Sequence, residues 1–174
     1  MNRSTLSMLA LLSAPTAVYA NAYMSVEQAQ AAMFPGEAMH TDARLLSGDQ
    51  ISAIKRASGE APLSKMLKAW RTASGGWFIV DEVVGKHEFI TFALALDGTG
   101  AVKGIEILDY REAYGGEVRN AKWRAQFMGK RAGAPLRLGN EIKNISGATL
   151  SSKHVTDGVR RLLATYAIVL AHSG

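Results

Sequence analysis

The chain contains no cysteine, and this absence excludes a disulfide framework, thiolate catalysis and metal or iron–sulfur sites built on cysteine. Its four histidines are far apart in the sequence and form no H-x-x-H pair, so a histidine metal site is not expected either. Lys and Arg outnumber Asp and Glu by only 20 to 15, and no four basic residues occur in a row. Nucleic-acid binding is therefore not expected.

Proline is also scarce, with four residues against 17 glycines, which is typical of a turn-rich domain rather than of a proline-rich linker. Apolar residues make up 48% of the 174 residues. A chain of this length and composition can bury the core of one domain and is too short for two of ordinary size.

The first twenty residues have the pattern of a secretory signal peptide. Arg3 precedes an apolar run over residues 6–12, and small residues follow it. The run is far shorter than the roughly 20 residues that span a bilayer. We therefore predict a signal peptide over residues 1–20, cleaved near Ala20 or Ala22, and a periplasmic location. The alternative is an uncleaved membrane anchor.

Helical patterns occur toward both ends of the chain. Ser25 and Gln28 form a capping box that begins a helix, and Pro35-Gly36 ends it. The last helix has the clearest apolar stripe, from Val155 to Leu170, with Ser151 or Ser152 as its N-cap. Shorter helices are predicted at three further places: residues 49–57, 63–70 and 121–128.

The apolar period changes from 3.6 to 2 in the middle of the chain. Three apolar segments follow one another, at residues 77–84, 87–96 and 101–108, and short glycine-containing turns join them. Consecutive strands joined in this way predict an antiparallel meander rather than β-α-β units. The sequence thus predicts an α+β fold, a single domain over residues 21–174 in which helices pack on an antiparallel sheet.

Small residues and hydroxyls gather just ahead of the last helix, in the sequence Ser146-Gly147-Ala148-Thr149. Gly147 and Ala148 allow a ligand or a sharp turn close to the backbone. The free N–H groups of a helix start favour an anion, above all a phosphate. The sequence therefore indicates a phosphate bound near Thr149. The alternative is a turn in which a hydroxyl caps the helix and no ligand binds.

This motif, continued by Leu150-Ser151-Ser152, resembles the flavinylation motif of the FMN-binding domain family. Three further segments are similar to that family in the same order: Phe34-Pro35-Gly36, residues 110–118 and residues 123–130. The family includes flavin-carrying components of the Rnf electron-transport complex and of the sodium-translocating NADH:quinone oxidoreductase, together with many small exported flavoproteins.

The resemblance implies FMN as the cofactor, joined through its phosphate to the hydroxyl of Thr149 by a dedicated magnesium-dependent flavin transferase that uses FAD. Lys143 stands where the family usually has Asp, and noncovalent FMN at the same place is the alternative. No catalytic residue is expected. The other residues expected to contact the cofactor are Ser146, Gly147, Ala148, Leu150, Ser151, Tyr114, Gly115, Glu117 and Trp123. Tyr114 and Trp123 are candidates to pack against the flavin ring, although Trp123, four residues before Phe127, also suits a core position.

These features predict an exported electron carrier that shuttles between a membrane or periplasmic donor and a redox partner, such as a cytochrome or a membrane electron-transport complex. Association with a membrane is expected only through partners. Two other functions remain open: a flavin-dependent reductase of a small acceptor, and a non-redox binding module in which residues 146–149 only cap the helix. Thr149 and His154 do not indicate a hydrolase, because no G-x-S-x-G elbow accompanies them.

Overall fold

The computed structural model describes residues 23–172. The predicted signal peptide, residues 1–20, and both predicted cleavage sites lie outside the described residues, so they stay predictions. Among the residues that are described, no helix is long and apolar enough to cross a membrane.

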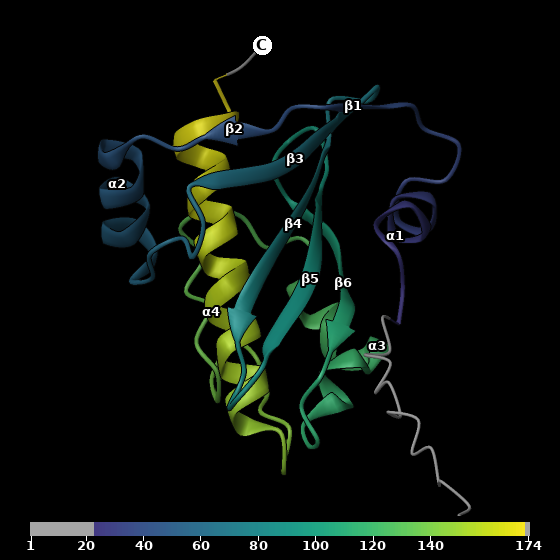
Figure 1. Ribbon diagram of the computed structural model, residues 1–174, viewed down its shortest axis with the longest axis vertical. Helices are drawn as coiled ribbons and strands as arrows, with labels where there is room; N and C mark the ends of the chain where they lie inside the picture. Colours follow the sequence, from purple (N-terminus) through teal and green to yellow (C-terminus); the bar gives the residue numbers. More distant parts are fainter. Residues whose placement is uncertain (1–22, 173–174) are drawn as a thin grey trace, which may run out of the picture.

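Six strands form one antiparallel sheet (Figure 1). Its order is β1-β3-β4-β5-β6, and β2 pairs with β3 beside β1. The strands β3 to β6 follow one another across the sheet, so the predicted meander is confirmed. The strand bounds are β1 Met39–Thr41, β2 Arg44–Leu45, β3 Met66–Thr72, β4 Trp77–Val84, β5 Phe89–Leu96 and β6 Val102–Tyr110.

Four α-helices accompany the sheet within the described part of the chain. They are α1 Val26–Met33, α2 Gly48–Ser58, α3 Ala121–Arg124 and α4 Thr149–Thr165. A 3-10 turn, η1 (Gly116–Arg119), precedes α3, another, η2 (Ala125–Phe127), follows it, and α4 continues into a π-helical turn, η3 (Tyr166–Leu170). The capping box predicted at Ser25 and Gln28 is present, and Ser47 and Gln50 form a second one before α2.

The helix predicted over residues 63–70 is wrong, because strand β3 occupies most of that range. Burial alternates along β3: Leu67 and Ala69 are buried, whereas Met66 and Lys68 are exposed. This period of two is the pattern of a strand with one covered face. As a strand, the segment pairs with β4 on one side and with β1 and β2 on the other, so it supplies hydrogen-bond partners that a helix there would not.

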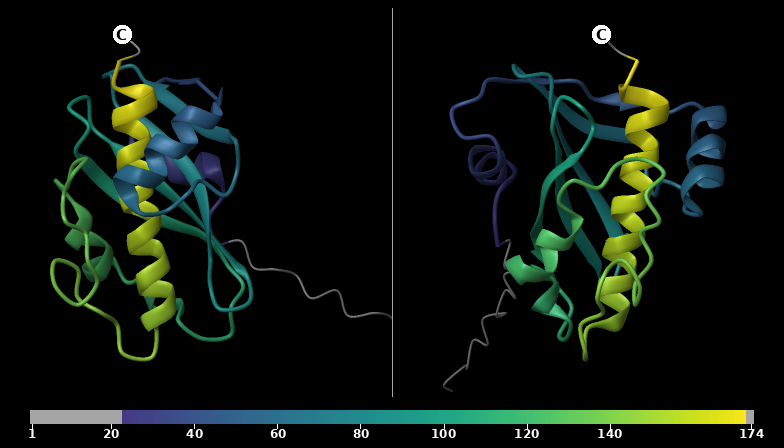
Figure 2. Two further views of the ribbon diagram at one scale, coloured as in Figure 1. Left: turned by 90° about the vertical axis from the view of Figure 1, so that its left-hand side faces the viewer. Right: turned by 180° about the vertical axis from the view of Figure 1, so that it is seen from behind.

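The sheet has a helix on each face, and alternate residues of β4 reach the two cores (Figure 2). Phe78 and Val80 belong to the core under α1, whereas Ile79 and Val83 belong to the larger core under α4. Gly158 allows α4 to approach the sheet closely, since a Cβ at that position would lie 2.6 Å from Val83. Helix α2 packs against α4 on the side away from the sheet (Figure 2).

A buried ion pair joins α4 to strand β4 of the sheet. Arg161 is only 4% exposed, and its guanidinium donates to the Asp81 carboxylate at 2.8 Å and to the carbonyl oxygen of Glu82 at 2.7 Å. A buried charge of this kind is stable only when it is paired and hydrogen-bonded. The pair therefore sets the position of α4 along β4, and with it the position of the helix start.

Candidate functional site

The start of α4 and the segment that leaves β6 meet at one end of the molecule, the lower end in Figure 1. Between them lies a pocket of about 310 Å³. The turn between β4 and β5 contributes a further wall. The lining residues are Lys86, Glu112, Tyr114, Gly115, Gly147, Ala148, Thr149, Leu150 and Ser151.

Helix α4 begins without a side-chain cap, in contrast to α1 and α2. The predicted caps Ser151 and Ser152 are wrong, because both residues lie inside the helix and are buried. The N-cap position is Ala148, whose side chain has no acceptor. The first N–H groups of a helix have no partner within it, so those at the start of α4 are available to an anion in the pocket.

Thr149 presents its hydroxyl at this helix start. The side chain is exposed, and its Oγ1 accepts a hydrogen bond of 3.0 Å from the Asn144 amide. Gly147 adopts a φ of +84°, a left-handed conformation that turns the chain sharply into the helix. Of the four hydroxyl residues between Lys143 and Lys153, only Ser146 and Thr149 are exposed.

A hydroxyl pair joins the two walls of the pocket. The Tyr110 hydroxyl lies 2.9 Å from that of Ser151 and also donates to the carbonyl oxygen of Tyr114. Burial raises the pKa of the Tyr110 phenol, so its proton is retained for this bond. Gly115 lies against this hydroxyl pair, where there is no room for a side chain. Its φ is +96°, and a Cβ there would lie 2.6 Å from Ser151 Oγ and closer still to the Tyr110 hydroxyl oxygen.

The third wall is a turn held by a carboxylate. Glu112 accepts hydrogen bonds from the backbone N–H groups of His87, at 2.5 Å, and Glu88, at 3.0 Å. Partial burial raises the pKa of Glu112, but these backbone donors outweigh it and hold the pKa below its ordinary value. The clamp fixes the turn that carries Lys86, which is the one basic side chain among the residues lining the pocket.

Most of the sequence-predicted contact residues come together here. Tyr114, Gly115 and the five residues from Gly147 to Ser151 line the pocket. Ser146 is exposed one residue before it, and Glu117 is exposed on η1 outside the lining. Tyr114 is 86% exposed, so its ring stands at the mouth of the pocket.

Trp123 lies in the core rather than in the pocket wall. It is 5% exposed, its ring meets that of Phe127 edge-on, and its indole N–H donates to the carbonyl oxygen of Lys143 at 2.8 Å. Trp123 therefore holds the segment leading to Thr149 against α3, which is an indirect contribution to the site.

The sequence did not single out Lys86 and Glu112 as site residues. Arg111 pairs with Asp109 at 2.7 Å rather than with its neighbour Glu112, which leaves Glu112 to hold the turn. The close approach of Glu112 to Gly85, where a Cβ would lie 2.5 Å from the carboxylate, joins segments that are distant in sequence, so no local signal could have found these residues.

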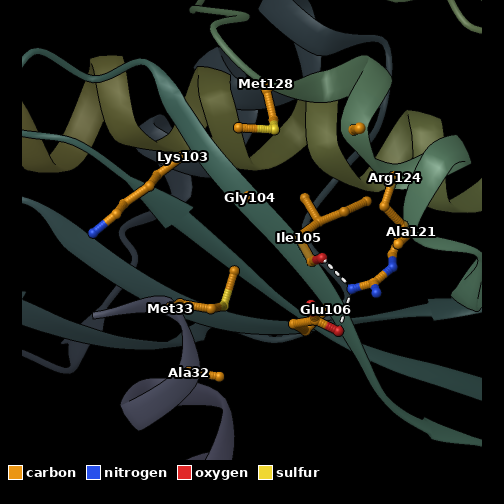
Figure 3. A pocket seen from close by; sticks show the side chains of 10 residues that line it. Ala32, Met33, Lys103, Gly104, Ile105, Glu106, Ala121, Arg124 and Met128 are labelled. Carbon is orange, nitrogen blue, oxygen red and sulfur yellow. Dashed lines mark hydrogen bonds and ion pairs between the residues drawn. The ribbon is translucent and has the colours of Figure 1, made fainter. Parts of the chain in front are cut away.

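A second pocket, of about 350 Å³, lies between α1, β6 and the α3–η2 segment (Figure 3). It shares no residue with the first pocket. Arg124 in its wall is already paired with Glu106 and donates to the carbonyl oxygen of Ile105, and Lys103 lies over the ring of Phe34. Its cations are therefore engaged within the protein, and it does not present the free donors found at the start of α4.

No group of three or more potential metal ligands occurs among residues 23–172. The pocket lining offers a hydroxyl, helix-start amides, one lysine and glycine backbone. This set of groups suits a phosphorylated ligand.

Comparison with known protein families agrees with this chemistry. Residues 85–164 match the family model of the FMN-binding domain, from the β4–β5 turn to near the end of α4. The match thus includes every residue that lines the first pocket. Residues 85–164 therefore form an FMN-binding domain, which implies a flavin-binding function. No curated protein matches the chain.

Proposed function

We propose that the protein is an exported electron carrier that holds FMN through a phosphoester to Thr149. The observation that carries the proposal is the exposed Thr149 hydroxyl at the uncapped start of α4, within the matched domain. A phosphoryl group on that oxygen lies beside the free amides of the first helical turn, which favour negative charge.

The other walls of the pocket suit the rest of the nucleotide. Gly115 keeps side chains away from one wall, and Lys86 supplies a positive charge. Tyr114 at the mouth offers an aromatic face to a flat ring. The residues present therefore fit the cofactor that the domain family suggests.

A tether is useful to an exported protein because a cofactor that dissociates outside the cytoplasm is lost. Attachment keeps the flavin at a high effective concentration in its pocket. Thr149 is a weak nucleophile unaided, and the described neighbour of its hydroxyl is the neutral amide of Asn144. This arrangement supports attachment by a separate flavin transferase, with FAD as donor.

Electron transfer between proteins suits the shape of the site better than catalysis on a bound substrate. The pocket volume of about 310 Å³ lies at the lower end of the range for ligand pockets, so part of the nucleotide stays at the surface. FMN, when bound, accepts and releases one or two electrons. The protein's own contribution is to hold it and to leave an edge accessible to a donor and an acceptor.

Intact-mass measurement tests the proposal. The full chain is produced with its predicted signal peptide in cells that contain a flavin transferase, and the exported protein is denatured and desalted. We expect a mass gain equal to FMN minus water in the wild type and in Ser146→Ala, and none in Thr149→Ala. A wild type that is yellow but gains no mass binds FMN noncovalently, which contradicts the ester. A colourless, unmodified wild type contradicts the electron-carrier function as well.

A further inference from the structure

The positive charge of the protein is concentrated in one segment. Residues 119–143 contain seven basic side chains and one acidic one, Glu141. The rest of the described chain contains 12 basic and 14 acidic residues. The entire positive excess of residues 23–172 therefore belongs to this segment. Three of its basic side chains, Arg119, Lys122 and Lys143, are exposed in the parts of the segment nearest the pocket, and we name these three the basic face.

Part of this charge is neutralised within the protein and part is not. Arg124 pairs with Glu106, and Arg137 pairs with Glu141. Over the described residues, Lys122, Lys130 and Lys143 have no acidic partner within ion-pair distance. Lys122 and Lys143 are also exposed. An exposed cation without an intramolecular partner adds its full charge to the field in front of the protein.

The basic face adjoins the pocket at both ends of the segment. At one end, η1 follows directly after Gly115. At the other end, Lys143 precedes Asn144, whose amide bonds to the Thr149 hydroxyl. The two ends are held together, because Lys143 accepts from Trp123 through its carbonyl oxygen and donates its N–H to Gln126 at 2.8 Å. Figure 2 shows α3 and the loop after it on one side of α4.

Two exposed apolar side chains belong to the pocket that the basic face adjoins. Tyr114 is 86% exposed and Leu150 is 47% exposed, and both line the pocket. Apolar contacts bordered by charged groups are the usual composition of a protein–protein interface, with the charges steering the encounter. Among the acidic groups nearby, Glu117 is exposed on η1, Glu88 is exposed at the β4–β5 turn, and the Glu112 carboxylate is occupied by backbone N–H groups.

We propose that the basic face beside Tyr114 and Leu150 is the docking surface for a redox protein with an acidic face. This inference rests on the proposed function, since the partner exchanges electrons with FMN in the adjoining pocket. Complementary charge raises the rate of such encounters and makes it depend on ionic strength. The surface thus selects its partner by charge, and the FMN in the adjoining pocket supplies the electrons.

The test uses holoprotein whose FMN content is first verified by intact mass. The flavin is reduced and mixed in a stopped-flow instrument with native cytochrome c, which is basic, or with succinylated cytochrome c, in which lysines carry carboxylates. Two cytochrome molecules each take one electron from a flavin reduced by two electrons, and the protons of the flavin pass to water. At low salt we expect the acidic cytochrome to react about tenfold faster than the basic one, a difference that disappears at high salt.

Charge reversal locates the effect. Lys122→Glu/Lys143→Glu is expected to remove or invert the preference for the acidic cytochrome, and Lys122→Glu alone to reduce it. The control Lys65→Glu/Lys68→Glu makes the same change in net charge at exposed lysines outside the basic face, in and just before β3, and is expected to keep the preference.

Three results overturn the inference while leaving the flavin attachment intact. One is the absence of any preference at low salt in fully loaded protein. Another is an equal loss of preference in both double variants, which assigns the effect to net charge rather than to this face. The third is salt-sensitive sedimentation of the wild type, but not of Lys122→Glu/Lys143→Glu, with phosphatidylglycerol vesicles, which assigns the face to a lipid surface. Protein that carries no FMN contradicts the proposed function instead.

Discussion

The hydroxyl oxygens of Tyr110 and Ser151 lie 2.9 Å apart, and their hydrogen bond joins the last residue of β6 to the first turn of α4. The same Tyr110 hydroxyl donates to the carbonyl oxygen of Tyr114, so the loop between these residues is closed over the helix start. One buried phenol thereby holds the two walls of the pocket in a fixed relation.

Removing that phenol hydroxyl is expected to destabilise the protein. Tyr110→Phe leaves the Ser151 hydroxyl and the Tyr114 carbonyl without their partner, and we expect a loss of about 1–2 kcal/mol in the free energy of unfolding. Ser151→Ala is expected to cost less. The coupling energy between the two hydroxyls is measured by a double-mutant cycle in urea, and the effects of the two single substitutions are expected to be non-additive. Strictly additive effects contradict a direct bond.

Gly115 is required for both its conformation and its space. Gly115→Ala is expected to lower the free energy of unfolding by roughly 3 kcal/mol, because the left-handed φ adds strain and the new Cβ meets two hydroxyl oxygens. Gly133→Ala is the matched control: its φ is +81° but nothing lies within 4 Å of the new Cβ, so only the conformational cost of about 1 kcal/mol is expected. Equal losses in the free energy of unfolding of the two variants, measured in urea, contradict the close packing at Gly115.

The Arg161–Asp81 pair is expected to matter far more than an exposed pair. Arg161→Leu leaves the Asp81 charge unpaired in a largely buried position and is expected to cost about 3–5 kcal/mol. Arg137→Leu removes a partner of Glu141 at the surface and is expected to leave the free energy of unfolding essentially unchanged. The free energies of unfolding of the two variants are measured in urea. Comparable losses in both variants contradict the role of the buried pair.

The clamp at Glu112 predicts a dependence on pH. Because the folded-state pKa of Glu112 is lowered, its contribution to stability is fully present above the ordinary value of 4.5 and is lost as the pH falls through the folded pKa. The wild type is therefore expected to be more stable than Glu112→Gln at pH 7, and the difference is expected to close in acid. Glu88→Gln, at the same turn, serves as the control. A difference that is constant from pH 7 to pH 3 contradicts the clamp.

Local sequence signals predicted much of the fold. The capping box at Ser25, the strand Trp77–Val84 and the apolar stripe of α4 depend on neighbours within a few residues, and the structure contains all three. The prediction of a helix over residues 63–70 was wrong because the apolar alternation there is short. The strands that pair with this segment, β1 and β4, come from other parts of the chain.

The site was predictable only in part, for the same reason. The motif at Thr149 is continuous in sequence, so its placement in a pocket with Gly115 could be expected. Lys86 and Glu112 reach the pocket through a hydrogen-bonded turn that no local pattern marks. The caps Ser151 and Ser152 were misplaced because a hydroxyl that usually caps a helix is used here inside one, against Tyr110.

The proposed attachment of FMN to Thr149 is tested most directly on a single tryptic peptide. Cleavage after Lys143 and Lys153 releases residues 144–153, which contain four hydroxyls: Ser146, Thr149, Ser151 and Ser152. Fragmentation of this peptide from transferase-treated protein is expected to locate the added FMN phosphoryl mass on Thr149. The same mass on one of the serines, or an unmodified peptide from protein that is yellow, contradicts the account.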